Sequence, residues 1–225
     1  EAALEKVRSR SLAMHKSDEL QEVVNTVYER LQELNVEMDS CNIAIFTEGK
    51  RDFEFWIASP HQKKTASFRI SADWDYTIIQ HLLAARESGN DFFSECFSFD
   101  EKNKWFEFAF TNTDFGRLPE ERKKYIFEQR AYALSIAFAK NTGVQINTYS
   151  GKLPSENEKE ILIRFSKVFE QAYIRFLDLQ KAESQAREAQ IEASLERVRA
   201  KAMAMHKSED LNSAVATVFE ELEKL

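Results

Sequence analysis

Glycine and proline are scarce in this chain, whose 225 residues include five glycines and three prolines. Because these two residues interrupt helices and strands, their scarcity predicts long helices joined by tight loops. It also leaves little material for a glycine-rich phosphate loop, and no Ser/His/Asp or Cys/His set stands at a legible spacing. We therefore expect that this chain is not an enzyme.

Cysteine and histidine are also rare. Cys41 and Cys96 do not make a disulfide framework, and we expect both to be thiols in a reducing cytoplasm. The four histidines show no spacing that would suit zinc. No apolar run is long enough to span a membrane and no signal peptide is visible, so we expect a cytoplasmic protein. The net charge of −7 argues against nucleic acid as a partner.

What the chain does contain is a long-period repeat. Glu1–Leu34 aligns without a gap with Glu192–Leu225, and eighteen of the 34 aligned positions are identical. Such a period predicts a repeated module in which each copy opens on the same elements. The second copy stops in the middle of its pattern and the chain starts without Met. We expect a fragment of a longer protein, with one whole module and the first helices of the next.

Both copies open with an apolar stripe at helical spacing. In the first copy the stripe consists of Leu4, Val7 and Met14. In the second copy it consists of Ile191, Leu195, Val198, Ala202 and Met205. A short heptad stripe of this kind pairs two helices in a coiled coil. We therefore predict a parallel homodimer joined along these residues, which we call the dimer seam.

The remaining segments show strand and helix periods. Period-two patterns predict strands at 41–47, 52–58, 65–71, 131–139 and 143–149. Helical patterns predict helices at 1–15, 17–37, 73–88, 119–129 and 155–205. Ser17 and Ser208 are expected N-caps, and Ser155 with Glu158 forms a capping box. The aromatic segments 92–99 and 104–110 are ambiguous between strand and helix.

This order of elements predicts an α+β fold with an antiparallel sheet of five or six strands and helices on both faces. Long helices at both ends would act as linkers and form a coiled coil. The strand at 131–139 alternates small and bulky side chains. We expect its small face under the first and last long helices and its bulky face toward the middle helices.

The element order resembles the GAF domain, a small-molecule sensor module. The repeated segments "LEKVRSRSLAMHKSDEL" and "LERVRAKAMAMHKSEDL" are similar to the helix before each GAF-like module in large signalling proteins of Bacteroidetes-type bacteria. Those proteins often end in a histidine kinase or a nucleotide cyclase. The resemblance implies linker helices at 1–16 and 181–207, a sensor domain at 17–180 and a truncated first helix of a second module at 208–225. A PAS-like or another α/β sensor topology is the alternative.

The resemblance does not identify a ligand. Cyclic-nucleotide GAF domains carry an Asn-Lys…Phe…Asp-Glu set, whereas "FDEKNK" at 99–104 has these letters in the wrong order and too close together. Bilin-binding relatives need a cysteine beside a histidine, and Cys96 has no such neighbour. The cofactor, if one binds, stays unknown.

Aromatic side chains gather in the segments that form the pocket in GAF domains. With two polar members, the candidate ligand-binding residues are Phe53, Phe55, Phe68, Trp74, Tyr76, His81, Phe93, Cys96, Trp105 and Phe108. A concave apolar pocket with a few polar groups is what a small ligand needs. The alternative is that the aromatic side chains fill the core and that His81 is a hydrogen-bonded core histidine.

His15 and His206 are candidate phosphate acceptors, because histidine kinases carry a phospho-accepting histidine on a dimeric helix. In histidine kinases an acid usually follows the phospho-accepting histidine directly, whereas Lys16 and Lys207 follow here and supply no base. A cation-prone pair at a helix C-terminus, favoured by the helix dipole, explains both histidines better.

We therefore expect a regulatory module of a cytoplasmic signal-transduction protein, such as a two-component system, that senses a small molecule. A stiff helix over 155–205 would carry a small shift or rotation of packed helices to a downstream output domain in the same chain. The alternative is a purely structural, dimerising spacer module without a ligand.

Overall fold

The computed structural model describes residues 1–16, 19–57, 67–205, 207 and 210–223. The chain divides into two compact units, Glu1–Arg175 and Phe176–Leu225, and each unit is described by itself. The first unit contains the residues 1–16 that the resemblance assigned to a linker.

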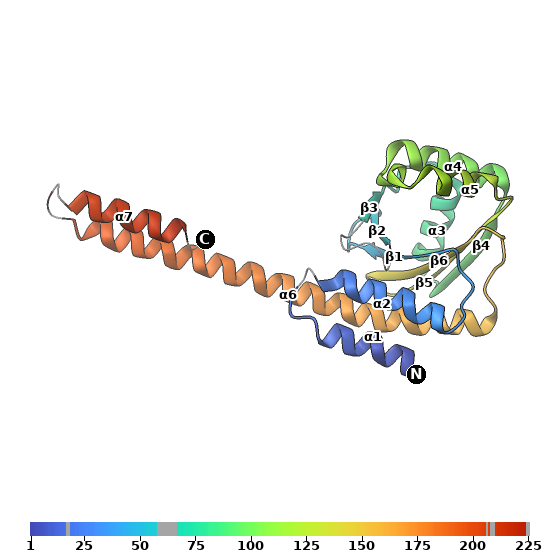
Figure 1. Ribbon diagram of the computed structural model, residues 1–225, viewed down its shortest axis with the longest axis horizontal. Coiled ribbons are helices and arrows are strands. Elements are labelled where there is room, and N and C mark those ends of the chain that lie inside the picture. Colours follow the sequence, from blue (N-terminus) through green and yellow to red (C-terminus); the bar gives the residue numbers. More distant parts are fainter. Residues whose placement is uncertain (17–18, 58–66, 206, 208–209, 224–225) are drawn as a thin grey trace. The chain divides into compact units, whose positions relative to one another are not determined.

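The first unit is built around a six-stranded sheet with the strand order β3-β2-β1-β6-β5-β4 (Figure 1). The strands are β1 (Ser40–Phe46), β2 (Phe53–Ile57), β3 (Ser67–Ile70), β4 (Phe92–Phe97), β5 (Tyr132–Phe138) and β6 (Thr142–Thr148). Every neighbouring pair is antiparallel. The predicted α+β fold with an antiparallel sheet is therefore confirmed.

The helices that the sequence predicts are present, and the structure adds one over Phe99–Asn112 and a short 3₁₀ helix at Asp114–Arg117. The helices are α1 (Ala2–Leu12), α2 (Leu20–Glu33), α3 (Thr77–Glu87), α4 (Phe99–Asn112), the 3₁₀ helix η2 (Asp114–Arg117), α5 (Glu120–Glu128), α6 (Glu156–Met203) and α7 (Asp210–Leu222). The predicted caps Ser17 and Ser208 and the histidine His206 lie outside the described residues. Within the part of the chain that the structure describes, no helix is long and apolar enough to cross a membrane.

The long helix α6 begins at the predicted capping box. The backbone N–H of Ser155 donates to the Glu158 carboxylate at 2.8 Å, and the N–H of Glu158 donates to Ser155 Oγ at 3.4 Å. These two bonds satisfy donors that the first turn of a helix leaves unpaired. The helical pattern predicted for 155–205 corresponds to the single helix α6.

A second capping box decides the two ambiguous aromatic segments. Phe92–Phe97 is strand β4, whereas 104–110 belongs to helix α4. Ser98 starts that helix, because its Oγ accepts from Glu101 N at 3.4 Å while its own N–H donates to the Glu101 carboxylate at 3.0 Å. The alternating aromatic side chains of 104–110 look like a strand, but the cap and burial against the sheet favour the helix.

The predicted helix at 73–88 begins only at Thr77. The side-chain amide of Gln80 donates to the carbonyl oxygens of Ala72 at 3.0 Å and of Trp74 at 2.8 Å. These bonds pair backbone groups in an irregular turn, so the chain does not need a helix there.

Two helical layers cover the sheet of the first unit. Helices α3, α4 and α5 lie on one face, and α2 with residues 156–175 of α6 lies on the other (Figure 1). The bulky side chains Tyr132, Leu134 and Ile136 of β5 join the core beneath α3, α4 and α5. On the opposite face, Ala133 and Ser135 lie beside the start of α6. The two faces of β5 are therefore oriented as the sequence predicts.

The first-copy part of the dimer seam is buried within one chain. Leu4, Val7 and Met14 are almost wholly buried. Helix α1 packs on α2, and Arg175 of α6 donates to the carbonyl oxygen of Met14 at 3.0 Å. An ion pair between Arg164 and the side chain of Glu1 adds a second tie. In this conformation these three seam residues contact the chain's own helices, so they offer no surface to a second chain.

The second unit consists of the C-terminal part of α6 and the helix α7. Arg197 of α6 pairs with the buried Glu221 of α7 at 2.7 Å. The seam residues of the second copy are half-buried or exposed: Ile191, Leu195, Val198, Ala202 and Met205. The predicted homodimer stays a prediction, and these five residues are the ones available for it.

Gly151 combines a left-handed backbone with close neighbours, so a side chain there would be both strained and crowded. Gly151 has φ +78°, and a Cβ there would lie 2.7 Å from Ala131 Cβ and 3.1 Å from Cys96 Sγ. Gly89 has a similar φ of +76° with open space around it.

We expect Gly89→Ala to lower the free energy of unfolding by about 1 kcal/mol and Gly151→Ala by about 3 kcal/mol, because only the second substitution adds a clash. Urea denaturation of both variants measures the difference, and equal losses would contradict it.

Candidate functional site

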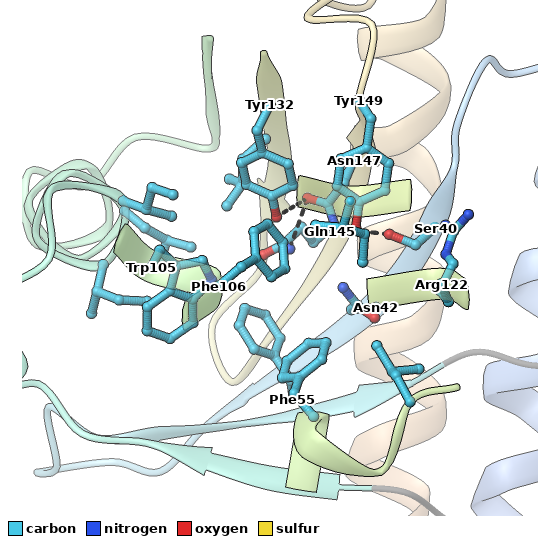
Figure 2. Close-up of a pocket in the computed structure, with 17 residues that line it drawn as sticks. Ser40, Asn42, Phe55, Trp105, Phe106, Arg122, Tyr132, Gln145, Asn147 and Tyr149 are labelled. Carbon is cyan, nitrogen blue, oxygen red and sulfur yellow. Dashed lines mark hydrogen bonds between the residues drawn. The ribbon is translucent and has the colours of Figure 1, made fainter. Parts of the chain in front are cut away.

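A cavity of about 100 Å³ lies between the sheet and the helices α3, α4 and α5 (Figure 2). One wall is apolar and consists of Phe55, Ile78, Ile79, Leu82, Trp105, Phe106, Phe115, Leu118, Ile126 and Leu134. The other wall is polar and consists of Ser40, Asn42, Arg122, Tyr132, Gln145, Asn147 and Tyr149. We call these the apolar wall and the polar wall.

Trp105 of α4 is held in the apolar wall by aromatic neighbours. The rings of Trp74 and Tyr76 have centroids 6.1 Å and 5.6 Å from that of Trp105, and Phe108 packs against both neighbours at 4.8 Å. Tilted and edge-on pairs at such distances are favourable. These three side chains therefore form a layer behind the cavity lining.

A hydrogen-bonded chain fixes the polar wall. The amide oxygen of Asn147 accepts from Tyr132 Oη at 2.8 Å and from Gln145 Nε2 at 3.0 Å, and Asn147 Nδ2 donates to Ser40 Oγ at 3.0 Å. Burial raises the pKa of Tyr132 well above its usual value, so the phenol remains a neutral donor. This row of hydrogen bonds links β1, β5 and β6 across the floor of the cavity (Figure 2).

One side-chain amide in this wall keeps an unused hydrogen-bonding group. Gln145 is only 2% exposed, yet its Oε1 has no partner among the described residues. Asn42, which is also buried, lines the same wall. Buried polar groups are normally paired, so unused ones that line a cavity point to a ligand or water.

The polar wall carries a positive charge at one end. Arg122 of α5 donates through Nη2 to the carbonyl oxygen of Asp39 at 3.1 Å, and its guanidinium lies 5.4 Å from the centroid of the Tyr149 ring. The Asp39 carboxylate accepts from Tyr149 N at 2.8 Å and from Tyr125 Oη at 3.3 Å. Burial raises the pKa of the Tyr149 phenol, which therefore stays neutral beside this cation.

The structure brings only two of the ten predicted pocket residues into the cavity lining: Phe55 and Trp105. Phe53 and Phe68 are buried in the surrounding core, and Trp74, Tyr76, Phe93 and Phe108 pack against that core. His81 is exposed and its Nδ1 lies 2.8 Å from Glu95 Oε2, so it belongs neither to the cavity nor to the core. Cys96 is exposed as well. The aromatic pattern thus predicts the core around the cavity rather than its lining.

Sequence reasoning missed the polar wall. In β6, Val144 and Ile146 alternate with Gln145 and Asn147, a pattern that usually places the amides in solvent. All residues of β6 are nevertheless buried, because helices cover both faces of the sheet. The available signal is the predicted sheet itself: when helices cover both faces, polar residues on a central strand indicate a cavity wall or a buried hydrogen-bond network.

A glutamate connects α6 to the same strands. The carboxylate of Glu170 accepts from the backbone N–H of Asn141 at 3.1 Å, from Asn141 Nδ2 at 2.7 Å and from Thr142 Oγ1 at 2.7 Å. These donors form the tight turn between β5 and β6. The strands that floor the cavity are therefore tied at one end to α6.

Metal binding and phosphate transfer to His15 are two other chemistries to compare with the cavity. Among the described residues, no group of three or more His, Cys, Asp or Glu side chains could hold a metal ion. His15 follows α1 as an exposed residue, and its backbone N–H donates to the Glu19 carboxylate at 3.1 Å. Its side chain is not part of the cavity.

The comparisons with known proteins reach only as far as the fold. No family model matches the sequence, and a search of the curated proteins finds no match. A solved structure that is similar is the bacteriophytochrome RpBphP3 of the photosynthetic bacterium R. palustris, with a TM-score of 0.50 and 10% sequence identity. The likeness covers 98% of this chain and 44% of the bacteriophytochrome chain. The fold is GAF-like, as the element order predicted.

Proposed function

We propose that this chain is a regulatory sensor module in which a small molecule in the cavity changes how the sheet packs against α6. The observation that carries the proposal is the position of β6 between the cavity and α6. Gln145 and Asn147 line the cavity, while Val144 and Ile146 are buried on the opposite face, which α2 and α6 cover. A change in the polar wall therefore bears directly on a strand that α6 contacts.

The hydrogen bonds from the turn after β5 to Glu170 support the transmission of a change in the sheet to α6. Packed cores respond to a local change by small shifts of whole elements, because they are not continuously deformable. A ligand that favours one placement of β6 would favour one placement of α6, provided that it binds the two arrangements with different affinity. The GAF-like fold that the chain shares with a bacteriophytochrome supports a sensory role by analogy only.

The helix α7 supports the proposal that a second module follows and receives the change. By the repeat, Leu211, Val215, Val218 and Leu222 correspond to Leu20, Val24, Val27 and Leu31. The four residues of α2 are fully buried under the first sheet, whereas those of α7 are 56%, 45%, 37% and 61% exposed. An apolar face of this kind suits the sheet of another module, through which an output domain further along the chain would be reached.

Hydrogen exchange combined with a fragment screen tests the sensor role. The probes are neutral, anionic and cationic molecules small enough for the cavity, and melting temperature identifies binders. A binder should slow amide exchange both in β6 and in residues 156–175 of α6. Binding that does not slow amide exchange in residues 156–175 would contradict the proposed transmission to α6. Absence of any binder would favour the alternative of a structural spacer, whose predicted dimerisation is measured by sedimentation.

A further inference from the structure

The polar wall is uneven in charge and in hydrogen bonding, and this unevenness narrows the choice of ligand. We infer that the cavity takes a small carboxylate that also carries a hydroxyl or N–H donor, such as a short 2-hydroxycarboxylate. The inference rests on the proposed function, because it names the ligand class of the same cavity.

The charge comes from Arg122. Of the described residues that line the cavity, it is the only charged one, and it forms no ion pair with the described chain. The nearby Asp39 carboxylate accepts from Tyr149 N and Tyr125 Oη and forms no ion pair with Arg122. One guanidinium nitrogen bonds to the Asp39 carbonyl oxygen, which leaves other N–H groups free. A planar guanidinium with free N–H groups binds a carboxylate through two parallel hydrogen bonds.

The need for a donor comes from Gln145. Its Oε1 is a buried acceptor without a donor in the described chain, while its Nε2 is already used by Asn147. A ligand hydroxyl or N–H would supply the missing hydrogen bond. Asn42, the register partner of Gln145 on the neighbouring strand β1, offers a further amide to a ligand oxygen (Figure 2).

The volume limits the size of the ligand. An engineered cavity of about 150 Å³ accepts benzene. The cavity of about 100 Å³ therefore suits a molecule of about six non-hydrogen atoms at most, and a nucleotide does not fit without repacking. Water is the competing occupant, but water would pair with Gln145 and offer the Arg122 guanidinium no negative charge.

Three probes of matched size separate the contributions in an NMR titration of the whole chain. Lactate carries both the carboxylate and the hydroxyl, propionate lacks the hydroxyl, and lactamide lacks the charge. Lactate should bind at least roughly tenfold more tightly than either of the others, because each lacks one buried polar contact. Lactamide binding as tightly as lactate would overturn the inference.

Two variants locate the contacts. Arg122→Gln should weaken lactate binding by roughly tenfold or more, and Gln145→Met should bring the affinities for lactate and propionate close together. The matched control is Arg117→Gln, because Arg117 is exposed, pairs with Asp114 at 3.0 Å and does not line the cavity. Lactate binding that is unchanged in Arg122→Gln would also overturn the inference.

The outcomes distinguish this inference from the proposed function. If no carboxylate binds but a neutral fragment occupies the cavity and protects α6, the ligand class is wrong and the sensor proposal stands. If lactate binds as expected but α6 exchange does not change, the ligand class stands and the proposed transmission to α6 fails. If no molecule of any class binds, both are wrong.

Discussion

Replacement of Glu170 by alanine should lower the free energy of unfolding by about 3 kcal/mol and loosen α6 from the sheet. The carboxylate accepts from the backbone and side chain of Asn141 and from the hydroxyl of Thr142, whose residue is fully buried. A hydrogen bond to a charged group contributes about 1.5–3 kcal/mol to stability. The donors that lose the carboxylate are poorly placed to bond to water instead. Denaturant titration measures the loss.

The same variant tests the connection between cavity and helix. In Glu170→Ala, amides of residues 156–175 should exchange faster, and a cavity ligand should protect β6 while protecting α6 less than in the wild type. Glu156→Ala is the control, since Glu156 forms an exposed pair with Lys159 at 3.4 Å on the same helix. Exposed pairs contribute about 0–1 kcal/mol, so this change should have little effect. A loss below 1 kcal/mol in Glu170→Ala would contradict the role given to the carboxylate.

A double-mutant cycle separates the contact from general damage. Thr142→Val removes one donor and keeps the shape of the side chain. If Glu170 and Thr142 act through their hydrogen bond, the double variant should be less destabilised than the sum of the single changes by about 1 kcal/mol. Additive losses would mean that the two residues stabilise the fold independently.

The sequence predicted those features of the fold that have local causes. Period-two alternation marked β5, whose bulky face lies toward the middle helices, and the Ser155–Glu158 capping box marked the start of α6. The segment 104–110 was not decided by its own pattern, because the residue that makes it helical is Ser98, six positions earlier. Local signals therefore identify an element when its own pattern is unambiguous, whereas an ambiguous pattern is decided by residues outside it, such as the cap Ser98.

Partners across space were harder to predict than elements. An apolar stripe such as Leu4, Val7 and Met14 shows that a helix face is buried, but the spacing does not say which surface buries it. In the first copy that surface is provided by the chain's own helices. Similarly, the amides of Gln145 and Asn147 carry no mark that separates a solvated strand face from a cavity wall. Their role depends on α3, α4 and α5, which come from other parts of the chain.

The other large effect is expected at Lys102, a buried lysine that holds α5 in place. Its ammonium is 0% exposed and donates to the carbonyl oxygens of Ile126, Phe127 and Gln129, at 3.2 Å and 2.5 Å for the last two. These carbonyls end α5, where a positive charge is favoured by the helix dipole. Since α5 also carries Arg122, Lys102 helps to place the cation of the polar wall.

Burial lowers the pKa of Lys102 to about 8 from an ordinary value of 10.5. Between these pH values the unfolded chain keeps the proton that the folded chain has lost, so the unfolded state binds more protons. Stability that depends on this group must therefore rise as the pH increases from 8 to 10.5. The shift corresponds to a total of about 3 kcal/mol.

A comparison with Lys102→Met isolates this group from the other groups that titrate at high pH. Methionine fills a similar volume but carries no charge. The free energy of unfolding of the wild type, minus that of Lys102→Met, should increase by up to about 3 kcal/mol between pH 8 and 10.5. Lys104→Met, at an exposed position of the same helix, controls for the loss of one positive charge. A difference that stays constant with pH would show that the carbonyl oxygens around Lys102 stabilise its ammonium fully, so that burial imposes no cost on the charge.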